Sequence, residues 1–209
     1  MVDDASTGLD SEALRRWFAP NALARTLITT TGGRSINIVL KETQDCISKE
    51  MVLAFGLDHI IMWRDRLTDL GATRYLDNTS SARGKPSIVV EAGHAGIVET
   101  DEVALLVDGT LSTMRALKML SGEPRPIENP VWLDRVVDVL SDGPGIWYPL
   151  VKRGAYVGRK IGFVTDYFGK VTLEARAPVS GVILHINAVP FLKKGDNIAD
   201  IAATAAHAP

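Results

Sequence analysis

The chain has 209 residues, of which 46% are hydrophobic, and it carries a formal net charge of −2 at a sequence pI near 6.1. This balance excludes the strongly basic surface that is typical of nucleic-acid binding, and no apolar run approaches the roughly 18 residues that a membrane span needs. The first residues lack the basic start and apolar core of a signal peptide, and the single cysteine, Cys46, cannot form an internal disulfide. We therefore expect a cytoplasmic protein of one large or two modest domains, without a nucleic-acid or membrane partner.

Strand-like and helix-like patterns alternate in the first part of the chain. Short apolar, β-branched runs predict strands at 27–31, 36–40 and 59–63. Between the last two, Asp45 can cap a helix that continues to about Phe55 and closes at Gly56. This alternation is typical of a parallel sheet covered by helices.

Two further helical segments follow. A short helix or turn is expected at 79–83, before a Gly-Lys-Pro breaker. The clearest helix is predicted over 100–120, with Thr100 as its N-cap and Arg115 and Lys118 in its last turn. Apolar residues at a spacing of three and four give this helix one apolar stripe: Val103, Leu106, Val107, Leu111, Met114 and Leu117.

The pattern changes at residues 121–130, which hold three prolines and cannot continue a helix. Beyond this linker, short apolar runs lie between regularly spaced turns. The turns are predicted at 141–145, 152–154, 166–169, 178–181 and 193–196. Such spacing predicts a small all-β barrel or sandwich.

Glu91 is the strongest candidate for chemistry. It follows the apolar run Ile88–Val90 and precedes a glycine-rich turn that contains Gly93 and Gly96. In open α/β sheets, ligands and catalytic groups lie at the carboxyl ends of such strands. A carboxylate at this edge can have its pKa raised toward the range that suits a general base. The alternative is a structural glutamate that caps a helix or pairs with an arginine.

The second half of the chain resembles the biotinyl/lipoyl-type barrel-sandwich hybrid. Three segments are similar to that fold's motifs: the paired glycines of 154–162, Ala-Pro-x-x-Gly at 177–181, and Leu-x-x-Gly-Asp at 192–196. Lys170 lies at about the spacing from Pro178 at which a lipoyl domain carries its modified lysine. We treat modification of Lys170 as the less favoured reading, because the usual Asp-Lys tip is replaced here by Phe-Gly-Lys.

Taken together, the two halves resemble the C-terminal portion of the succinylglutamate desuccinylase/aspartoacylase family. The similar segments are 54–58, the Gly-Lys-Pro-x-x-x-x-Glu-x-Gly stretch at 84–93, and the helix end at 117–120 with its proline break. The resemblance spans about 20–202. It implies a partial carboxypeptidase-like zinc-hydrolase α/β domain at 1–123 and a small all-β barrel-sandwich domain at 127–203.

The same resemblance implies an activity. Members of the family are zinc-dependent amidohydrolases that deacylate N-acyl amino acids of the succinylglutamate or acetylaspartate type, and Glu91 corresponds to their catalytic carboxylate. Zinc would be the cofactor, and a small-molecule N-acyl amino acid the substrate. Zinc lowers the pKa of a bound water and polarises the acyl carbonyl.

The sequence departs from the family at the metal site. The family binds zinc through a His-x-x-Glu motif and a later histidine, but none of the four histidines here has Glu at the third following position. At the strand end where the later histidine would stand, the chain has Thr31, a poor zinc ligand. We therefore predict no metal ligands in this chain and an inactive chain on its own. A shortened reading frame and a degenerate protein both remain as explanations.

Three residues are secondary candidates for substrate binding. His94 lies in the glycine-rich loop after Glu91, and Arg74 and Arg83 could hold a substrate carboxylate by bidentate contacts. A local hydrogen bond for His94 and solvation for the arginines are the plainer interpretations. The alternative function is a non-catalytic remnant that acts as a binding or interaction module. The sequence leaves homo-oligomer formation open.

Overall fold

The computed structural model describes residues 25–28, 35–39, 45–63, 69–71, 73–93, 97–152, 154, 156–157 and 160–205. These residues divide into two compact units. The first holds the described residues within 25–27, 36–90 and 100–130, and the second holds residues 28 and 35 and the described residues within 91–99 and 131–205. None of the helices in the described ranges is long and apolar enough to cross a membrane.

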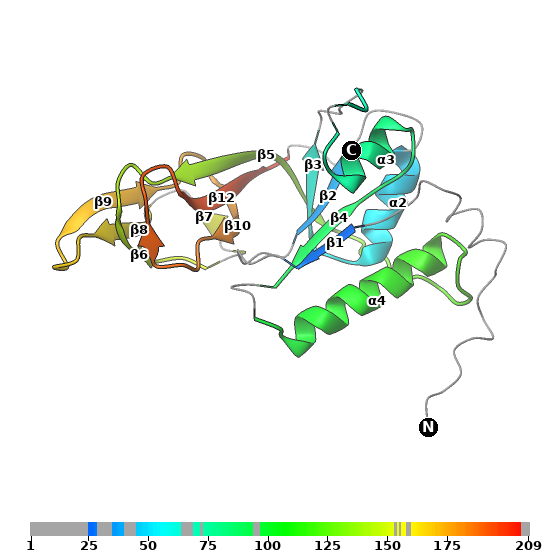
Figure 1. The fold of residues 1–209 in the computed structure, drawn as a ribbon. Coiled ribbons are helices and arrows are strands. Elements are labelled where there is room, and N and C mark those ends of the chain that lie inside the picture. The colour runs from blue at the N-terminus through cyan, green and yellow to red at the C-terminus, as the bar shows by residue number, and fades with distance from the viewer. Residues whose placement is uncertain are drawn as a thin grey trace. The chain divides into compact units, whose positions relative to one another are not determined.

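The first unit combines strands with helices, as the alternating pattern predicts (Figure 1). It holds most of the strands β1 (Arg25–Ile28), β2 (Ser35–Val39), β3 (His59–Trp63) and β4 (Val89–Ala92), which are neighbours in the order β1-β4-β2-β3. Glu91 and Ala92, the last two residues of β4, are counted with the second unit. Strands β2 and β3 are parallel, with Ile36 opposite Ile60. The helices are α2 (Asp45–Phe55), α3 (Leu76–Ala82) and α4 (Thr100–Ala116). The expected α/β character of this part is therefore confirmed.

Helices α2 and α4 pack closely against each other. A Cβ atom added at Gly109 on α4 would lie 2.5 Å from Cε1 of Phe55 on α2, so only glycine allows this approach. The proline-rich segment after α4 folds back onto the same helices. Its Ile127 N–H donates to the Leu53 carbonyl at 2.9 Å, and its Arg125 N–H donates to Ser112 Oγ at 2.8 Å.

Helix α4 ends four residues earlier than predicted. Lys118 adopts a left-handed conformation with φ 59°, its N–H donates to the Arg115 carbonyl, and the Met119 N–H donates to the Met114 carbonyl. These two bonds are those of a Schellman motif, which ends a helix by satisfying its last carbonyls. The prediction failed because that position is usually glycine, and here it is lysine.

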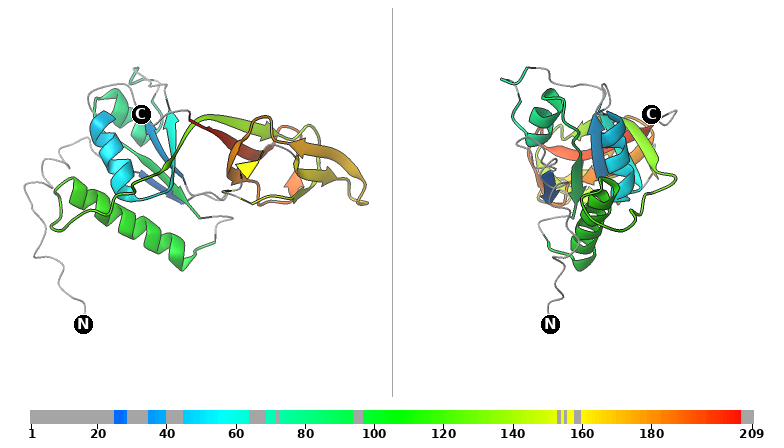
Figure 2. Two further views of the ribbon diagram at one scale, coloured as in Figure 1. Left: turned by 180° about the vertical axis from the view of Figure 1, so that it is seen from behind. Right: turned by 90° about the vertical axis from the view of Figure 1, so that its right-hand side faces the viewer.

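The second unit contains two antiparallel sheets (Figure 2). Strands β5-β12-β10-β7 are successive neighbours within one sheet, and the complete order of the other sheet is β11-β6-β8-β9. The strand bounds are Val131–Leu140 (β5), Gly145–Pro149 (β6), Tyr156–Val157 (β7), Lys160–Thr165 (β8), Val171–Arg176 (β9), Gly181–Ile186 (β10), Phe191–Leu192 (β11) and Asn197–Thr204 (β12). The described residues of the five predicted turns lie at connections between these strands, with Gly145 and Gly181 already the first residues of β6 and β10. No helix occurs after residue 130 in the part of the chain that the structure describes.

One hydrophobic core joins the two sheets of the second unit. It takes residues from both sheets: Trp147, Ile161, Val164, Ala175, Ile183, Leu192, Ile198, Ala199 and Ile201. Gly162 lies directly against this core, because a Cβ atom there would meet the Trp147 ring. The all-β character of the second half is thus confirmed, whereas its assignment to the lipoyl-type barrel-sandwich and the boundaries 1–123 and 127–203 stay predictions.

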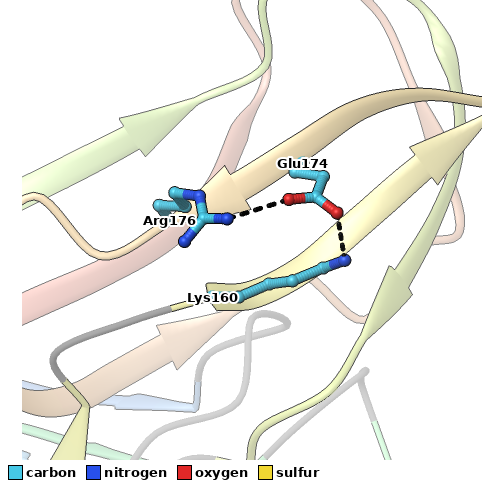
Figure 3. Close-up of polar contacts among 3 residues, drawn as sticks. All are labelled: Lys160, Glu174 and Arg176. Carbon is cyan, nitrogen blue, oxygen red and sulfur yellow. Dashed lines mark hydrogen bonds and ion pairs between the residues drawn. The ribbon is translucent and has the colours of Figure 1, made fainter.

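The β8–β9 hairpin carries an exposed charged cluster (Figure 3). Lys160 Nζ lies 2.5 Å from Glu174 Oε1, and Arg176 Nη2 lies 3.0 Å from Glu174 Oε2. The hydrogen bond from Lys160 and its positive charge lower the pKa of Glu174, and Arg176 adds to the effect. The opposite charges of these three side chains compensate one another at the solvent-exposed surface. The cluster is therefore typical of a solvated sheet face and not of a ligand-binding site.

Candidate functional site

Glu91 is the third residue of β4, one position before the strand ends at Ala92. The strand was expected to end at Glu91. Side chains alternate along β4, so Val90 and Ala92 are buried whereas Glu91 is only partly buried. Gly93 follows with φ 97°, a backbone conformation that favours glycine and turns the chain sharply after the strand. The local sequence therefore leaves one carboxylate near a turn, as the pattern predicted.

The pKa of Glu91 is raised above its ordinary value. Burial is the main cause, because a carboxylate removed from water ionises less readily. The negative charge of Asp200 raises the pKa further, and a positive charge on His185 opposes both effects. A carboxyl group in such surroundings has greater affinity for a proton than one in water, which is the property that a general base requires.

Asp200 and His185 come from neighbouring strands of the second unit, to which Glu91 also belongs. They are direct cross-strand partners in the β10–β12 ladder. His185 Nδ1 lies 3.3 Å from Asp200 Oδ2, and Asn197 Nδ2 donates to Asp200 Oδ1 at 2.6 Å. Burial, the largest single effect on Asp200, raises its pKa. The hydrogen bonds from His185 and Asn197, the charge of His185 and a contact with Asp138 outweigh it, so the net pKa is lowered.

The sequence did not reveal the His185–Asp200 pair. Spacing along the sequence gives His185 no partner. The chain between the two residues passes through β11, which belongs to the other sheet, and a bulge interrupts the register between Ile183 and His185. The positions of the turns in the sequence therefore do not predict that His185 pairs with Asp200.

The other predicted site residues fall elsewhere. Arg74 and Arg83 are exposed residues on either side of α3 in the first unit. His94 and Thr31 lie outside the described residues. His59, the first residue of β3, contacts Asp58 at 2.8 Å. Lys170 follows the tip of the β8–β9 hairpin, and its backbone N–H donates to Asp166 Oδ1 at 2.9 Å. The roles predicted for Glu91, His94, Arg74 and Arg83 stay predictions.

A shallow depression of about 360 Å³ lies in the first unit. It is lined by residues of α2, the end of α4 and the proline-rich segment: Cys46, Lys49, Glu50, Leu53, Ala54, Ala116, Pro124 and Pro126. None of the predicted site residues lines it.

The described residues do not fit a zinc site. A catalytic zinc ion takes three protein ligands from His, Cys, Asp and Glu, and no group of three such residues capable of holding a metal occurs in the ranges that the structure describes. His185 and Asp200 contact each other and leave no oxygen of this carboxylate without a protein partner. Asp200 Oδ2 lies next to His185 Nδ1, and Asp200 Oδ1 accepts a hydrogen bond from Asn197 Nδ2.

Comparisons with known proteins show what this fold resembles. No family model matches the sequence, and a comparison with curated proteins gives no match. Several solved structures are similar. The product-bound ectoine utilization protein EutE (DoeB) from Ruegeria pomeroyi superposes with a TM-score of 0.75 at 19% identity, over 93% of this chain and 62% of that one.

Two further structures carry the family's own name. A succinylglutamate desuccinylase/aspartoacylase from Rhodobacter sphaeroides has a TM-score of 0.75 at 16% identity, covering 94% of this chain and 63% of that one. A succinylglutamate desuccinylase from Silicibacter sp. TM1040 has a TM-score of 0.76 at 18% identity, covering 93% and 62%. At these identities the likeness concerns the fold. It confirms the structural resemblance to a portion of this family, and the chain spans about 62–63% of the length of these proteins.

Proposed function

We propose that the chain contributes Glu91 as the proton acceptor of a site that hydrolyses the amide bond of N-acyl amino acids. The observation that carries the proposal is the Glu91 carboxylate itself, half-buried near the end of β4, with its pKa raised by burial and by Asp200. The structural likeness to succinylglutamate desuccinylase/aspartoacylase proteins supports the reaction class.

In this reaction the chain's own part is proton transfer. Glu91 takes a proton from the attacking water as the water oxygen bonds to the acyl carbon. The carbon–nitrogen bond then breaks, and Glu91 passes the proton to the leaving amine, which gives a carboxylic acid and a free amino acid. General-base assistance of this kind is worth about 10²–10⁴-fold in rate. In the resembled family zinc polarises the carbonyl, whereas the described residues of this chain do not fit a zinc site.

A second candidate is a module that binds N-acyl amino acids without turning them over. It is favoured by the absence of a His-x-x-Glu motif from the sequence. Both candidates share the ligand class and differ in turnover, so one experiment separates them.

The test measures binding and turnover on the same purified chain. Calorimetry with N-acetylaspartate and N-succinylglutamate reports binding, and release of free amine, with and without added zinc chloride, reports hydrolysis. Glu91→Gln keeps the shape of the side chain but cannot accept a proton, and Glu128→Gln alters an exposed linker carboxylate as the control.

Amine release that falls by about 10²–10⁴-fold in Glu91→Gln, with Glu128→Gln unchanged, supports the hydrolase. Binding without amine release supports the binding module. A chain that neither binds nor hydrolyses these compounds contradicts both proposals.

A further inference from the structure

Strand β9 forms one edge of the four-stranded sheet in the second unit. In the order β11-β6-β8-β9 it pairs antiparallel with β8, with Glu174 opposite Phe163, and no other strand of the described ranges pairs with it. Alternate residues of an edge strand direct their backbone N–H and C=O groups away from the sheet, where another strand can bond to them. The opposite edge, β11, has two residues, whereas β9 has six. Strand β9 is therefore the edge of this sheet that is long enough to accept a partner strand.

The sequence of β9, Val-Thr-Leu-Glu-Ala-Arg, does little to prevent such pairing. Natural edge strands are commonly protected by proline, by lysine or by a charged side chain that points inward. Strand β9 contains neither proline nor lysine, and its inward side chains are apolar: Ala175 belongs to the hydrophobic core and Leu173 packs against it. Its charged residues, Glu174 and Arg176, lie on the outer face, with side chains 45% and 66% exposed.

A bulge limits the part of this edge that can pair. The register between β8 and β9 shifts between the pairs Val164–Leu173 and Thr165–Val171, so no residue of β8 lies opposite Thr172. A bulge bends its strand and interrupts regular pairing. The regular part of the free edge therefore runs from Leu173 to the end of the strand at Arg176.

A second copy of this chain fits the regular segment, because the charges of the segment complement themselves. Two antiparallel strands related by a two-fold axis keep their faces matched only when one residue lies on the axis, opposite its own copy. With Ala175 on the axis, each Glu174 lies opposite the Arg176 of the other copy, and opposite charges in such cross-strand pairs are favourable. With Glu174 or Arg176 on the axis, two like charges face each other instead.

The remaining register is excluded by the bulge. With Leu173 on the axis, Glu174 would lie opposite Thr172, which places the irregular part of both strands inside the pairing. In the free chain, one oxygen of Glu174 contacts Lys160 Nζ at 2.5 Å and the other contacts Arg176 Nη2 at 3.0 Å (Figure 3). The Ala175 register brings the Arg176 of the second copy to the same carboxylate, so solvated charges become ion pairs between the copies.

We propose that the chain forms a homodimer in which two β9 strands pair antiparallel around Ala175, with two Glu174–Arg176 ion pairs between the copies. The two four-stranded sheets then form one continuous sheet. So short a pairing belongs to the weak contacts that bury less than about 1,200 Å², so the dimer forms only as the protein concentration rises. The proposal does not depend on the proposed hydrolase, because Glu91 takes no part in it.

Sedimentation equilibrium of the full chain, at concentrations up to about 1 mM, measures this dimer. The wild-type mass should rise from 22.6 kDa toward twice that value. Glu174→Arg places two arginines opposite each other, and Arg176→Glu places two glutamates opposite each other, so each variant should weaken the dimer by about tenfold or more. An equimolar mixture of the two variants restores opposite charges in both pairs and should form a heterodimer. Lys194→Glu reverses an exposed charge in the turn before β12 and should dimerise like the wild type.

Hydrogen exchange locates the contact independently of the charges. The backbone amides of 173–177 should exchange more slowly at high than at low protein concentration, and those of the first unit should not change. If Glu174→Arg does not fold in thermal melts, Arg176→Glu and the exchange pattern decide. A wild-type chain that stays monomeric overturns the proposal. A dimer that survives both charge reversals, a mixture of folded variants that stays monomeric, or protection that develops outside β9 overturns it as well.

Discussion

Gly162 of β8 offers the sharpest test of how the second unit packs. A Cβ atom at this position would meet Cη2 of Trp147, would lie 2.5 Å from Cζ3 of the same ring, and would lie 2.6 Å from the Tyr148 carbonyl oxygen. Ordinary carbon–carbon contacts are about 3.5–4.0 Å. Gly162→Ala therefore forces the ring to move by about 1 Å, and Trp147 is only 2% exposed within the core.

Overpacking of this kind costs about 1–3 kcal/mol. For a chain of this size each kcal/mol lowers Tm by about 2–4 °C, so we expect the Tm of Gly162→Ala to fall by about 2–12 °C. Calorimetry or tryptophan fluorescence during heating measures it. Gly143→Ala is the matched control, since its added Cβ meets nothing within 4 Å.

A second substitution tests the cause of the loss. Phenylalanine lacks the Cη2 and Cζ3 atoms of tryptophan, so Trp147→Phe should make room for the new methyl group. The double variant should then be more stable than the sum of the two single losses predicts. Strictly additive losses, or a Gly162→Ala chain as stable as Gly143→Ala, would refute the packing argument.

Three further expectations follow from single contacts. Glu91 has a raised pKa in the folded chain, so ionising it costs folded-state stability as pH rises from about its ordinary value of 4.5 through the raised value. The Tm of Glu91→Gln should therefore rise relative to that of the wild type between pH 4 and pH 8, and a constant difference in thermal melts would contradict this sign. Lys118→Gly should stabilise the chain by about 0.5–1 kcal/mol in urea unfolding, because its φ of 59° is strained for lysine but not for glycine. Asp166→Ala should lose about 1 kcal/mol in the same assay, because Asp166 Oδ1 accepts from the N–H groups of Phe168 and Lys170 at 2.9 Å.

Local chemistry made part of the fold predictable. Helix α2 was placed correctly from Asp45 to Phe55 because a capping residue begins it and Gly56, with φ 88°, ends it. The β-branched run at 59–63 gave β3 within its observed bounds. Short elements were less well defined: α3 begins at Leu76, before the predicted 79, because Tyr75 at its N-cap makes no side-chain capping bond that the sequence could reveal.

The same reasoning explains what was missed at the site. Glu91 could be singled out because an apolar strand and a glycine turn flank it within six residues, and all of that information is local. Its electrostatic surroundings are not local: Asp200 and His185 follow it by about a hundred residues and meet through a ladder that contains a bulge. Residue spacing predicts which side chains are neighbours within one helix or strand. It does not predict which carboxylates from distant strands of a sheet come close to Glu91. A lone histidine on a strand, such as His185, is therefore best judged only after the residue opposite it is known, because that residue determines which ring nitrogen remains available.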